Sequence, residues 1–272
     1  MRQGVTAMLK VTNLQKTFNA GTINAKTALS GFDLHIADGD FVTVIGGNGA
    51  GKSTLLNAIA GVWKPDYGII EIDGVDVTNM PEPKRAKFLG RVFQDPMKGT
   101  APDMEIAENL SIAARRGTKR KLIWGCTRKD RESYKALLAQ LGLGLEDRLS
   151  SKVGLLSGGQ RQAVTLLMAT IRKPKILLLD EHTAALDPKT AAKVLEITDK
   201  LVTENKLTTL MITHNMHDAI AYGNRLIMMH EGRVVVDVSG EAKKQLTISQ
   251  LLNLFEEASG SAFSNDKVML SK

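Results

Sequence analysis

Short apolar runs of strand length recur through the first third of the chain. Some alternate with polar residues and others are uninterrupted, and both patterns are typical of strands. Turn-forming Asp-Gly pairs follow two of these runs. A short helical pattern interrupts the series within residues 80–94. The predicted strands are Leu9–Leu14, Leu29–Ile36, Phe41–Ile45, Ile69–Ile72 and Arg91–Gln94.

The pattern changes between about Asp95 and Leu155. Ile106–Arg115 and Glu132–Leu141 place apolar residues three and four positions apart, which is helical spacing, and no strand-like run lies between them. We therefore expect an inserted α-helical subdomain, which we place at about residues 95–165.

Strand and helix patterns alternate in the part that follows. This alternation favours a parallel sheet with helices on both faces. An amphipathic pattern over 246–258 predicts a last helix, and the tail after Gly260 is polar. We expect an α/β domain at 8–240 and a C-terminal helix and polar tail at 241–272. The predicted strands are Ile176–Leu179, Thr208–Thr213 and Arg225–Met229, and the predicted helices are Lys189–Glu204 and Asn215–Tyr222.

The composition excludes several classes of protein. A hydrophobic content of 43% in 272 residues suffices for a folded core and excludes a disordered chain. No apolar run approaches the roughly 18–20 residues that span a bilayer. The first residues lack the apolar segment of a secretory signal, so we expect no such signal. Cys126 is the single cysteine, so no internal disulfide forms.

The net charge of +7 favours contact with anionic partners. Aromatic residues make up 4% of the chain, too few for a platform that stacks on nucleic-acid bases, so we expect no nucleic-acid partner. The basic residues between Arg115 and Arg131 form either a solvated loop and helix face or a contact for anionic lipid or an acidic partner. They are Arg115, Arg116, Lys119, Arg120, Lys121, Arg128, Lys129 and Arg131.

A glycine-rich segment fits the pattern of a phosphate-binding loop. The run GGNGAGKST at 46–54 follows the strand pattern Phe41–Ile45 and precedes a helical pattern. Its glycines let the backbone approach phosphate oxygens, and the helix N-terminus attracts an anion. Lys52 is expected to contact the β- and γ-phosphates of a nucleotide, and Ser53 to bind Mg²⁺. The candidate loop is Gly46, Gly47, Asn48, Gly49, Ala50, Gly51, Lys52, Ser53 and Thr54.

Two carboxylates follow the apolar strand pattern Ile176–Leu179. Asp180, at the end of a buried strand in a chain with a phosphate-binding loop, is expected to hold Mg²⁺ directly or through water. Glu181 is the next residue and is placed to orient or deprotonate an attacking water, which is general-base chemistry. The two motifs together predict hydrolysis of a nucleoside triphosphate.

A second glycine-containing run, Leu156-Ser-Gly-Gly-Gln-Arg-Gln162, leads into a helical pattern. Ser157 is a favourable N-cap, so this run forms a second helix N-terminus that attracts anions. With the motifs in this order, the chain resembles the ATP-binding cassette (ABC) ATPases over residues 8–240. The resemblance implies a P-loop NTPase (RecA-like) core with an N-terminal antiparallel β subdomain and an inserted α-helical subdomain.

The resemblance also implies roles for single residues. Phe18 matches the aromatic position that stacks on adenine. Gln94 matches the glutamine that meets Mg²⁺ or the attacking water, and His214 matches the switch histidine at the γ-phosphate. Ala185–Asp187 matches the loop that crosses the dimer interface. In this family the signature of one subunit closes over ATP held by another, and here the signature residues are Ser157, Gly158, Gly159 and Gln160.

Two positions depart from the family pattern, which commonly has proline at both. His182 is expected next to the catalytic carboxylate, where it either packs or caps locally or tunes the local charge. Gly47 is expected to loosen the phosphate-binding loop without abolishing phosphate binding.

The resemblance implies the ATP-binding and ATP-hydrolysing subunit of a membrane transporter, peripheral at the cytoplasmic face, with ATP and Mg²⁺ bound. The implied partners are a second ATPase subunit, separate transmembrane permease subunits and an extracytoplasmic substrate-binding protein. A single cassette on its own chain is typical of bacterial importers, and the chain is similar to ATPases of bacterial uptake systems for amino acids, aromatic ones among them. The alternatives are an exporter or lipoprotein-release ATPase, and a soluble ABC ATPase acting on DNA or the ribosome.

Overall fold

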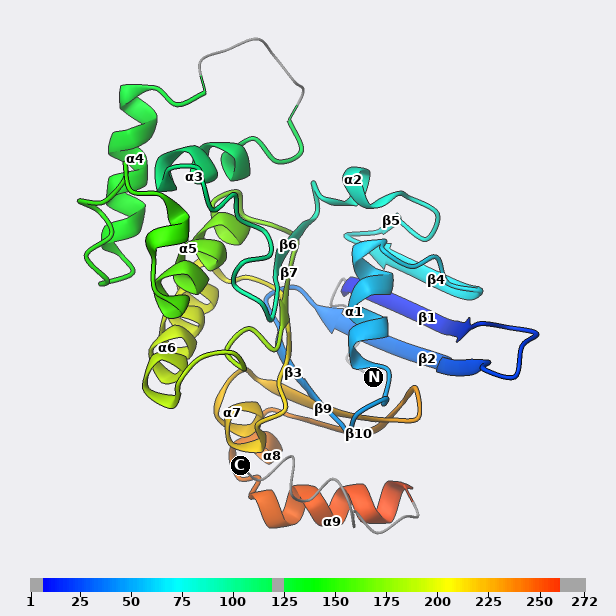
Figure 1. Cartoon of the computed structure of the whole chain (residues 1–272). Coiled ribbons are helices and arrows are strands. Elements are labelled where there is room, and N and C mark those ends of the chain that lie inside the picture. Colours follow the sequence, from blue (N-terminus) through cyan, green and yellow to red (C-terminus); the bar gives the residue numbers. More distant parts are fainter. Residues whose placement is uncertain (1–6, 119–124, 260–272) are drawn as a thin grey trace. The chain divides into compact units, whose positions relative to one another are not determined.

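The computed structural model describes residues 7–118 and 125–259 (Figure 1). The chain forms two compact units. Unit 1 is Met1–Arg85 together with Lys206–Lys272, and unit 2 is Ala86–Asn205. None of the helices in the described part of the chain has the length and hydrophobicity of a membrane-spanning segment. The polar tail expected after Gly260 and the basic residues Lys119, Arg120 and Lys121 lie outside the described residues.

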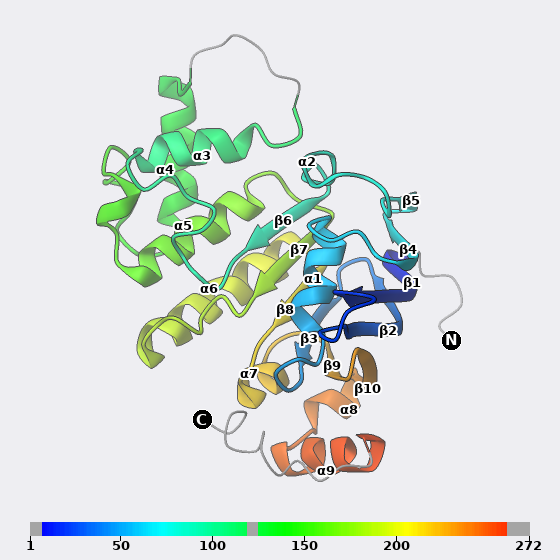
Figure 2. The same ribbon diagram turned by 45° about the vertical axis from the view of Figure 1, so that its right-hand side comes forward.

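Unit 1 contains an antiparallel sheet with the strand order β2-β1-β4-β5 (Figure 2). In β1, Leu9 and Val11 are fully buried, and Leu14 returns to the buried face after a register shift at Asn13, whose φ is 46°. The expected antiparallel strands are confirmed and extend beyond their apolar runs, whereas β5 was not predicted. The strands are β1 (Ala7–Phe18), β2 (Lys26–Ala37), β4 (Tyr67–Ile72) and β5 (Val75–Asp76).

A second set of strands in unit 1 has the order β10-β9-β3-β8. β3 is parallel to both of its neighbours and every residue of it is buried, as expected for a strand covered on both faces. The prediction of a parallel sheet is confirmed here. β10 was missed, although its valines alternate, and it pairs antiparallel with β9. The elements are β3 (Phe41–Ile45), β8 (Thr209–Ile212), β9 (Arg225–His230), β10 (Arg233–Ser239), α1 (Lys52–Ala60) and α7 (Met216–Ala221).

The predicted C-terminal helix is confirmed as α9 (Ile248–Ser259), which follows the short helix α8 (Glu241–Lys244). Leu251 and Phe255 are one turn apart and are 0% and 3% exposed. They join a buried cluster with Met228 of β9 and Val236 of β10. The helix therefore adds its apolar stripe to the core of unit 1.

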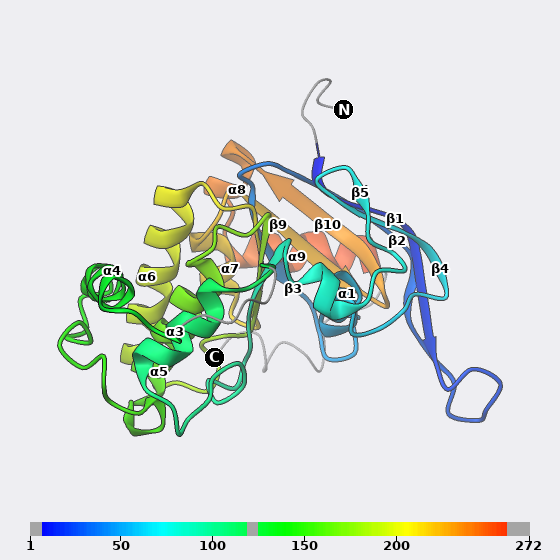
Figure 3. The ribbon, with the colours of Figure 1, turned by 90° about the horizontal axis from the view of Figure 1, so that it is seen from above.

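Unit 2 pairs β6 (Leu89–Val92) with β7 (Ile176–Asp180) in parallel, and both strands are labelled in Figure 2. Helices of the same unit are labelled in Figure 3. The expected strand Arg91–Gln94 is wrong in its bounds, because pairing begins at Leu89 and ends at Val92. A Cβ atom on Gly90 would meet the Ala169 carbonyl oxygen at 2.4 Å, so a helix packs directly on β6. The helices are α3 (Ile106–Ala114), α4 (Arg128–Ala139), α5 (Gly158–Thr170), α6 (Pro188–Asn205) and the 3₁₀ helix η1 (Val153–Leu155).

Helix α4 begins at Arg128, four residues before the predicted start at Glu132. Thr127 is the N-cap: its hydroxyl oxygen accepts from the backbone N–H of Asp130 at 3.2 Å. In return the Asp130 carboxylate accepts from the backbone N–H of Thr127 at 2.8 Å. This reciprocal cap stabilises a charged first turn that the spacing of apolar residues cannot reveal.

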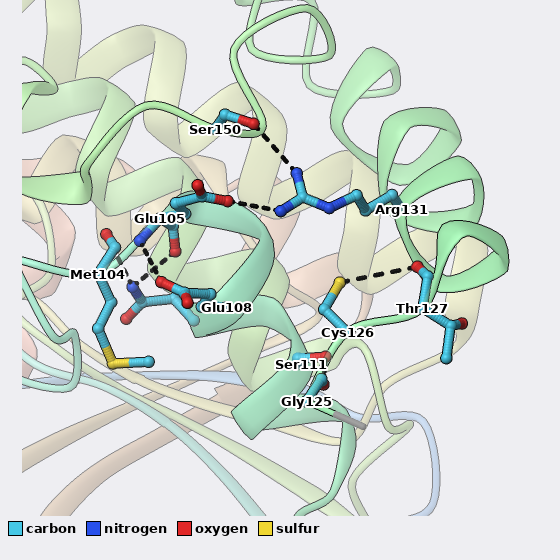
Figure 4. A network of polar contacts seen from close by, with 10 residues as sticks. Met104, Glu105, Glu108, Ser111, Gly125, Cys126, Thr127, Arg131 and Ser150 are labelled. Carbon is cyan, nitrogen blue, oxygen red and sulfur yellow. Dashed lines mark hydrogen bonds and ion pairs between the residues drawn. The ribbon is translucent and has the colours of Figure 1, made fainter. Parts of the chain in front are cut away.

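The basic stretch between Arg115 and Arg131 is partly used inside unit 2. Arg131 donates to Glu105 at 2.6 Å and to Ser150 at 3.1 Å (Figure 4). Arg116 donates to the carbonyl oxygens of Ala169 and Arg172, each at 2.9 Å. Arg115 likewise donates to the Gly125 carbonyl oxygen at 2.8 Å, so these three described basic residues of the stretch tie helices and loops together. The expectation of a merely solvated face does not hold for them.

Arg85, at the end of α2 (Glu82–Arg85), is 1% exposed and closes the end of α1. Its guanidinium donates to the carbonyl oxygens of Ala58 at 2.6 Å and Ile59 at 3.0 Å, two of the last carbonyls of α1. It also donates to Met80 at 2.7 Å and Thr78 at 2.9 Å. A buried cation thus meets the negative end of the helix dipole, which holds α1 at its C-terminus.

We expect Arg85→Met to lower the free energy of unfolding by about 2–4 kcal/mol, because buried carbonyl oxygens lose their donors. Urea unfolding followed by circular dichroism measures the change. Arg233→Met is the matched control: Arg233 is exposed and donates to Ser30 Oγ at 3.3 Å, so its loss should stay below about 0.5 kcal/mol. Equal unfolding midpoints for the two variants would refute the role of Arg85.

Candidate functional site

The glycine-rich loop at 46–51 joins the end of β3 to the start of α1 and needs glycine where the backbone is crowded. A Cβ atom on Gly46, whose φ is 152°, would lie 2.3 Å from the Met229 carbonyl oxygen. One on Gly51, whose φ is 98°, would lie 2.4 Å from the Ala28 carbonyl oxygen. Gly49 has a φ of 83° and lies in more open space. The pattern G-x-x-x-x-G therefore reflects close backbone packing at both ends of the loop.

The chemical groups of this loop suit an anion. Lys52 is 8% exposed, and its Nζ donates to the carbonyl oxygens of Gly46 at 2.6 Å and Gly47 at 3.1 Å. Gly51 is the N-cap of α1 and supplies no side-chain cap, so no side chain competes with an anion at that helix end. Ser53 is exposed beside Lys52. The loop thus brings together a cation, a helix N-terminus and a hydroxyl, the groups that bind phosphate and Mg²⁺.

His214 lies at the same sheet edge as the loop. β3 and β8 are parallel with Val44 opposite Ile212, and the chain continues two residues to Gly46 on one strand and to His214 on the other. The carboxyl ends of parallel strands meet at one edge, so the two residues are neighbours there. Asn215 then caps α7 by accepting from the backbone N–H of His217 at 2.8 Å. Unit 1 therefore places the candidate histidine beside the phosphate-binding loop.

Phe18 ends β1 and contacts an aromatic residue that the sequence did not single out. Its ring meets that of Trp63 edge to face, with centroids 5.3 Å apart. Trp63 follows α1 and is 40% exposed. Phe18 is half-buried, and Lys16 Nζ lies 5.6 Å from its ring centroid. The two rings form an exposed aromatic corner of unit 1.

Gln94, Asp180 and Glu181 share an edge of unit 2. β6 and β7 are parallel with Val92 opposite Leu179, and each chain runs two residues further to Gln94 and to Glu181. Glu181 has a φ of 44°, a conformation that few residues other than glycine adopt. Its carbonyl oxygen accepts from the backbone N–H of Ala184 at 3.0 Å. The amide and the two carboxylates are thus brought together by the register of one strand pair.

His182 is a packed residue and not a charged one. It is 2% exposed, and its Nε2 lies 3.0 Å from Thr198 Oγ1 on α6. The Thr198 hydroxyl donates to the Val194 carbonyl oxygen at 2.8 Å, so its oxygen accepts from the ring and Nε2 has the hydrogen. Burial lowers the pKa of His182 to about 4. Of the two expectations for this residue, local packing is confirmed, and the lowered pKa leaves the ring without a positive charge at neutral pH.

The signature run caps α5. The Ser157 hydroxyl oxygen accepts from the backbone N–H of Gln160, and the Gln160 side chain accepts from the backbone N–H of Ser157, both at 3.3 Å. A Cβ atom on Gly159 would lie 2.1 Å from Thr190 Cγ2 on α6. Ser157 and Gly158 are exposed at this helix end. Close packing of α5 on α6 therefore requires Gly159, while the two residues before it face solvent.

The candidate residues fall into two groups. Unit 1 contains Phe18, the loop at 46–54 and His214, and unit 2 contains Gln94, Asp180, Glu181 and the signature run 157–160. Sequence reasoning missed Trp63 and Arg91, whose Nη2 lies 3.4 Å from Asp180 Oδ2. The one available signal for Arg91 was that it is a charged residue within the short strand β6.

Comparison with known proteins identifies the class that this arrangement defines. The family model for ABC transporters matches residues 29–184. A tyrosine transport ATP-binding protein of Clostridioides difficile is 47% identical over 251 residues, covering 92% of this chain and 100% of that protein. The chain therefore belongs to the ABC transporter ATP-binding family, and it is an ATPase.

Two further relatives agree with this assignment. The thiamine import ATP-binding protein ThiQ of Photobacterium profundum is 35% identical over 226 residues, covering 81% of this chain and 88% of that protein. An ATP-binding cassette solved as a dimer in a post-hydrolysis state with ADP and Pi is 31% identical with a TM-score of 0.73, covering 85% of this chain and 98% of that one. The expected P-loop NTPase fold is thereby confirmed.

The buried, neutral His182 should make stability fall in acid. Its folded-state pKa of about 4 lies below the ordinary 6.5, so between these values the unfolded chain binds a proton that the folded chain does not. Stability is then unaffected above pH 6.5, falls as the pH drops from 6.5 to 4, and levels off below. By linkage, the loss between pH 7 and pH 5 is about 2 kcal/mol.

Urea unfolding at pH 7 and pH 5 measures this effect. His182→Gln has no titrating ring and should lose about 2 kcal/mol less between the two pH values than the wild type does. Thr198→Val removes the hydrogen bond but keeps the buried ring, so it should retain the full pH dependence. A parallel pH response of His182→Gln and the wild type would contradict a neutral buried imidazole.

Proposed function

We propose that the chain is the ATPase subunit of a bacterial uptake system for an amino acid, with aromatic amino acids such as tyrosine as the substrate class. The observation that supports this is the 47% identity to a tyrosine transport ATP-binding protein, which extends over the whole of that protein. The thiamine import relative is 35% identical and the chain covers less of it. The nearer relative therefore favours the amino-acid substrate.

ATP would bind along the loop at 46–54. Lys52 would turn from the carbonyl oxygens of Gly46 and Gly47 to the β- and γ-phosphates, exchanging neutral acceptors for charged ones. Backbone N–H groups at the N-terminus of α1 would add further donors. Phe18 would stack on adenine, and the edge-on ring of Trp63 would support it.

Mg²⁺ would be held by Ser53, Asp180 and Gln94. These residues supply hydroxyl, carboxylate and amide oxygens, the hard donors that Mg²⁺ prefers. Asp180 and Gln94 lie at the same edge of the β6–β7 pair, and Ser53 lies exposed next to Lys52. When bound, Mg²⁺ offsets the negative charge of the β- and γ-phosphates.

Glu181 would accept a proton from the water that attacks the γ-phosphate, with Gln94 orienting that water and His214 contacting the phosphate. Ser157, Gly158, Gly159 and Gln160 of a second copy would close over the nucleotide in a head-to-tail dimer. The exposed cap at Ser157 and the dimeric state of the solved relative support this part of the proposal.

The proposal includes partners beyond the second ATPase subunit. Separate transmembrane permease subunits would hold the chain at the cytoplasmic face of the membrane, and an extracytoplasmic protein would deliver the substrate. We keep the ATPase domain at 8–240, with the α-helical subdomain at about 95–165 as the part that docks on the permeases. Residues 241–272 are kept as a C-terminal helix and polar tail that follow the ATPase domain. No nucleic acid takes part.

We expect Glu181→Gln to bind ATP as the wild type does and to hydrolyse it roughly 10²–10⁴-fold more slowly, because the water loses its base. With ATP and Mg²⁺ the variant should persist as a dimer in size-exclusion chromatography. Glu204→Gln is the matched control, since Glu204 is exposed on α6 of the same unit, and it should keep wild-type turnover. Turnover near the wild-type value in Glu181→Gln would remove Glu181 from the mechanism.

Uptake of radiolabelled tyrosine by cells tests the substrate and the direction of transport. Deletion of the gene for this chain should abolish uptake, and the wild-type gene should restore it. The Lys52→Ala variant should not restore it, because the β- and γ-phosphates lose their cation. Slower efflux in the deletion strain would instead favour the exporter alternative. Unchanged movement of label in both directions would refute the proposed substrate.

A further inference from the structure

Arg91 is a charged residue in β6 whose side chain shares a face with Asp180. Arg91 lies opposite Leu178 in the parallel pairing of β6 with β7. Asp180 follows Leu178 by two residues, and side chains two residues apart on a strand point to the same face. Arg91 Nη2 lies 3.4 Å from Asp180 Oδ2, and the two side chains are 14% and 18% exposed.

The ring of Phe93 holds the Arg91 guanidinium from another side. Arg91 Cζ lies 4.6 Å from the centroid of that ring, within the range of a cation–π contact. Phe93 is itself fixed by Gln162, a fully buried residue of α5, whose Nε2 donates to the Phe93 carbonyl oxygen at 3.0 Å. The guanidinium therefore contacts both a carboxylate and the ring of a residue whose backbone is hydrogen-bonded to α5.

A cation in this position affects a carboxylate in two ways. It restrains rotation of the carboxylate by holding one of its oxygens. It also offsets part of the negative charge, so that a second cation is attracted less strongly. Arginine is suited to both effects, because its planar group is always charged and stacks on aromatic rings.

We propose that Arg91 is a positioning residue that holds Oδ2 of Asp180, leaving the other carboxylate oxygen for Mg²⁺. The inference rests on the proposed function, in which Asp180 is a Mg²⁺ ligand, and gives Arg91 no contact with ATP or metal. Because Phe93 directly precedes Gln94, the contacts of Arg91 also connect the segments of the two proposed Mg²⁺ ligands in unit 2. Arg91 would therefore weaken the attraction of Asp180 for Mg²⁺ and, in return, fix the orientation of the Asp180 carboxylate.

Two measurements on Arg91→Met separate geometry from charge. Steady-state turnover should fall about tenfold, as is usual when a residue that orients a metal ligand is lost. Isothermal titration calorimetry with the non-hydrolysable analogue AMP-PNP gives the second readout, in EDTA and in Mg²⁺. Affinity in EDTA should match the wild type. The ratio of the AMP-PNP affinity in Mg²⁺ to that in EDTA is the Mg²⁺-dependent gain. It should increase about threefold, because the Arg91 guanidinium no longer competes with Mg²⁺ for the Asp180 carboxylate.

The other variants make the result specific. Arg91→Lys keeps the charge, so the Mg²⁺-dependent gain should return to the wild-type value while turnover recovers only in part. Phe93→Leu keeps the ion pair and should give a smaller change than Arg91→Met in the same direction. Arg91→Lys and Phe93→Leu still test the role of Arg91 if Arg91→Met does not fold. Arg131→Met, which breaks the 2.6 Å ion pair with Glu105 in the same unit, is the matched control and should change neither readout.

Asp180→Asn distinguishes the proposed metal role of Asp180 from the proposed positioning role of Arg91. If Asp180→Asn abolishes both turnover and the Mg²⁺-dependent gain while Arg91→Met behaves as the wild type, Asp180 is a metal ligand and the inference about Arg91 is wrong. The inference is also wrong if turnover and the gain fall together in Arg91→Met, because loss of β6 structure alone would do that. If Asp180→Asn changes neither readout, the proposed metal role of Asp180 itself fails.

Discussion

Parallel pairing between buried strands is the constraint on which the chemistry of this protein depends. The pairing of Val44 with Ile212 places His214 beside Gly46, and the pairing of Val92 with Leu179 places Gln94 beside Glu181. A slip of one residue would displace each group by about 3.3 Å and turn its side chain to the opposite face. The apolar strand interiors therefore hold the candidate site residues in place.

Close backbone contact is the second constraint, and it explains why the motifs contain glycine at particular positions. Gly46 and Gly51 lie against carbonyl oxygens of neighbouring strands, and Gly159 lies against Thr190. The first two make room for a phosphate-binding loop beside a sheet. The third lets α5 approach α6 while Ser157 and Gly158 stay exposed. Glycine thus permits close packing at all three positions and, at Gly46 and Gly51, also forms the phosphate-binding loop.

Buried polar side chains hold the segments around the site without joining it. Arg85 closes the C-terminal end of the helix whose N-terminus follows the loop. His182 ties the segment after Glu181 to α6 through Thr198. Each is satisfied by hydrogen bonds, so burial does not leave an unpaired polar group in the core. The contact of His182 with Thr198 holds the residue next to Glu181, whose φ is 44°, against α6.

The sequence by itself determined the motifs, the strand that precedes the phosphate-binding loop and the α/β class, because a run such as GGNGAGKST has its chemical meaning in its local order. It could not determine that α4 starts at Arg128, that β6 ends at Val92, or that β10 pairs with β9, since these depend on caps and on partners distant in the chain. Neither Trp63 nor Arg91 stood out, because each gains its role from one contact across the fold, with Phe18 and with Asp180. His182 shows the same limit. Its place beside the proposed catalytic carboxylate in the sequence left open whether it packs or tunes the local charge, and only the structure shows that it is buried against α6.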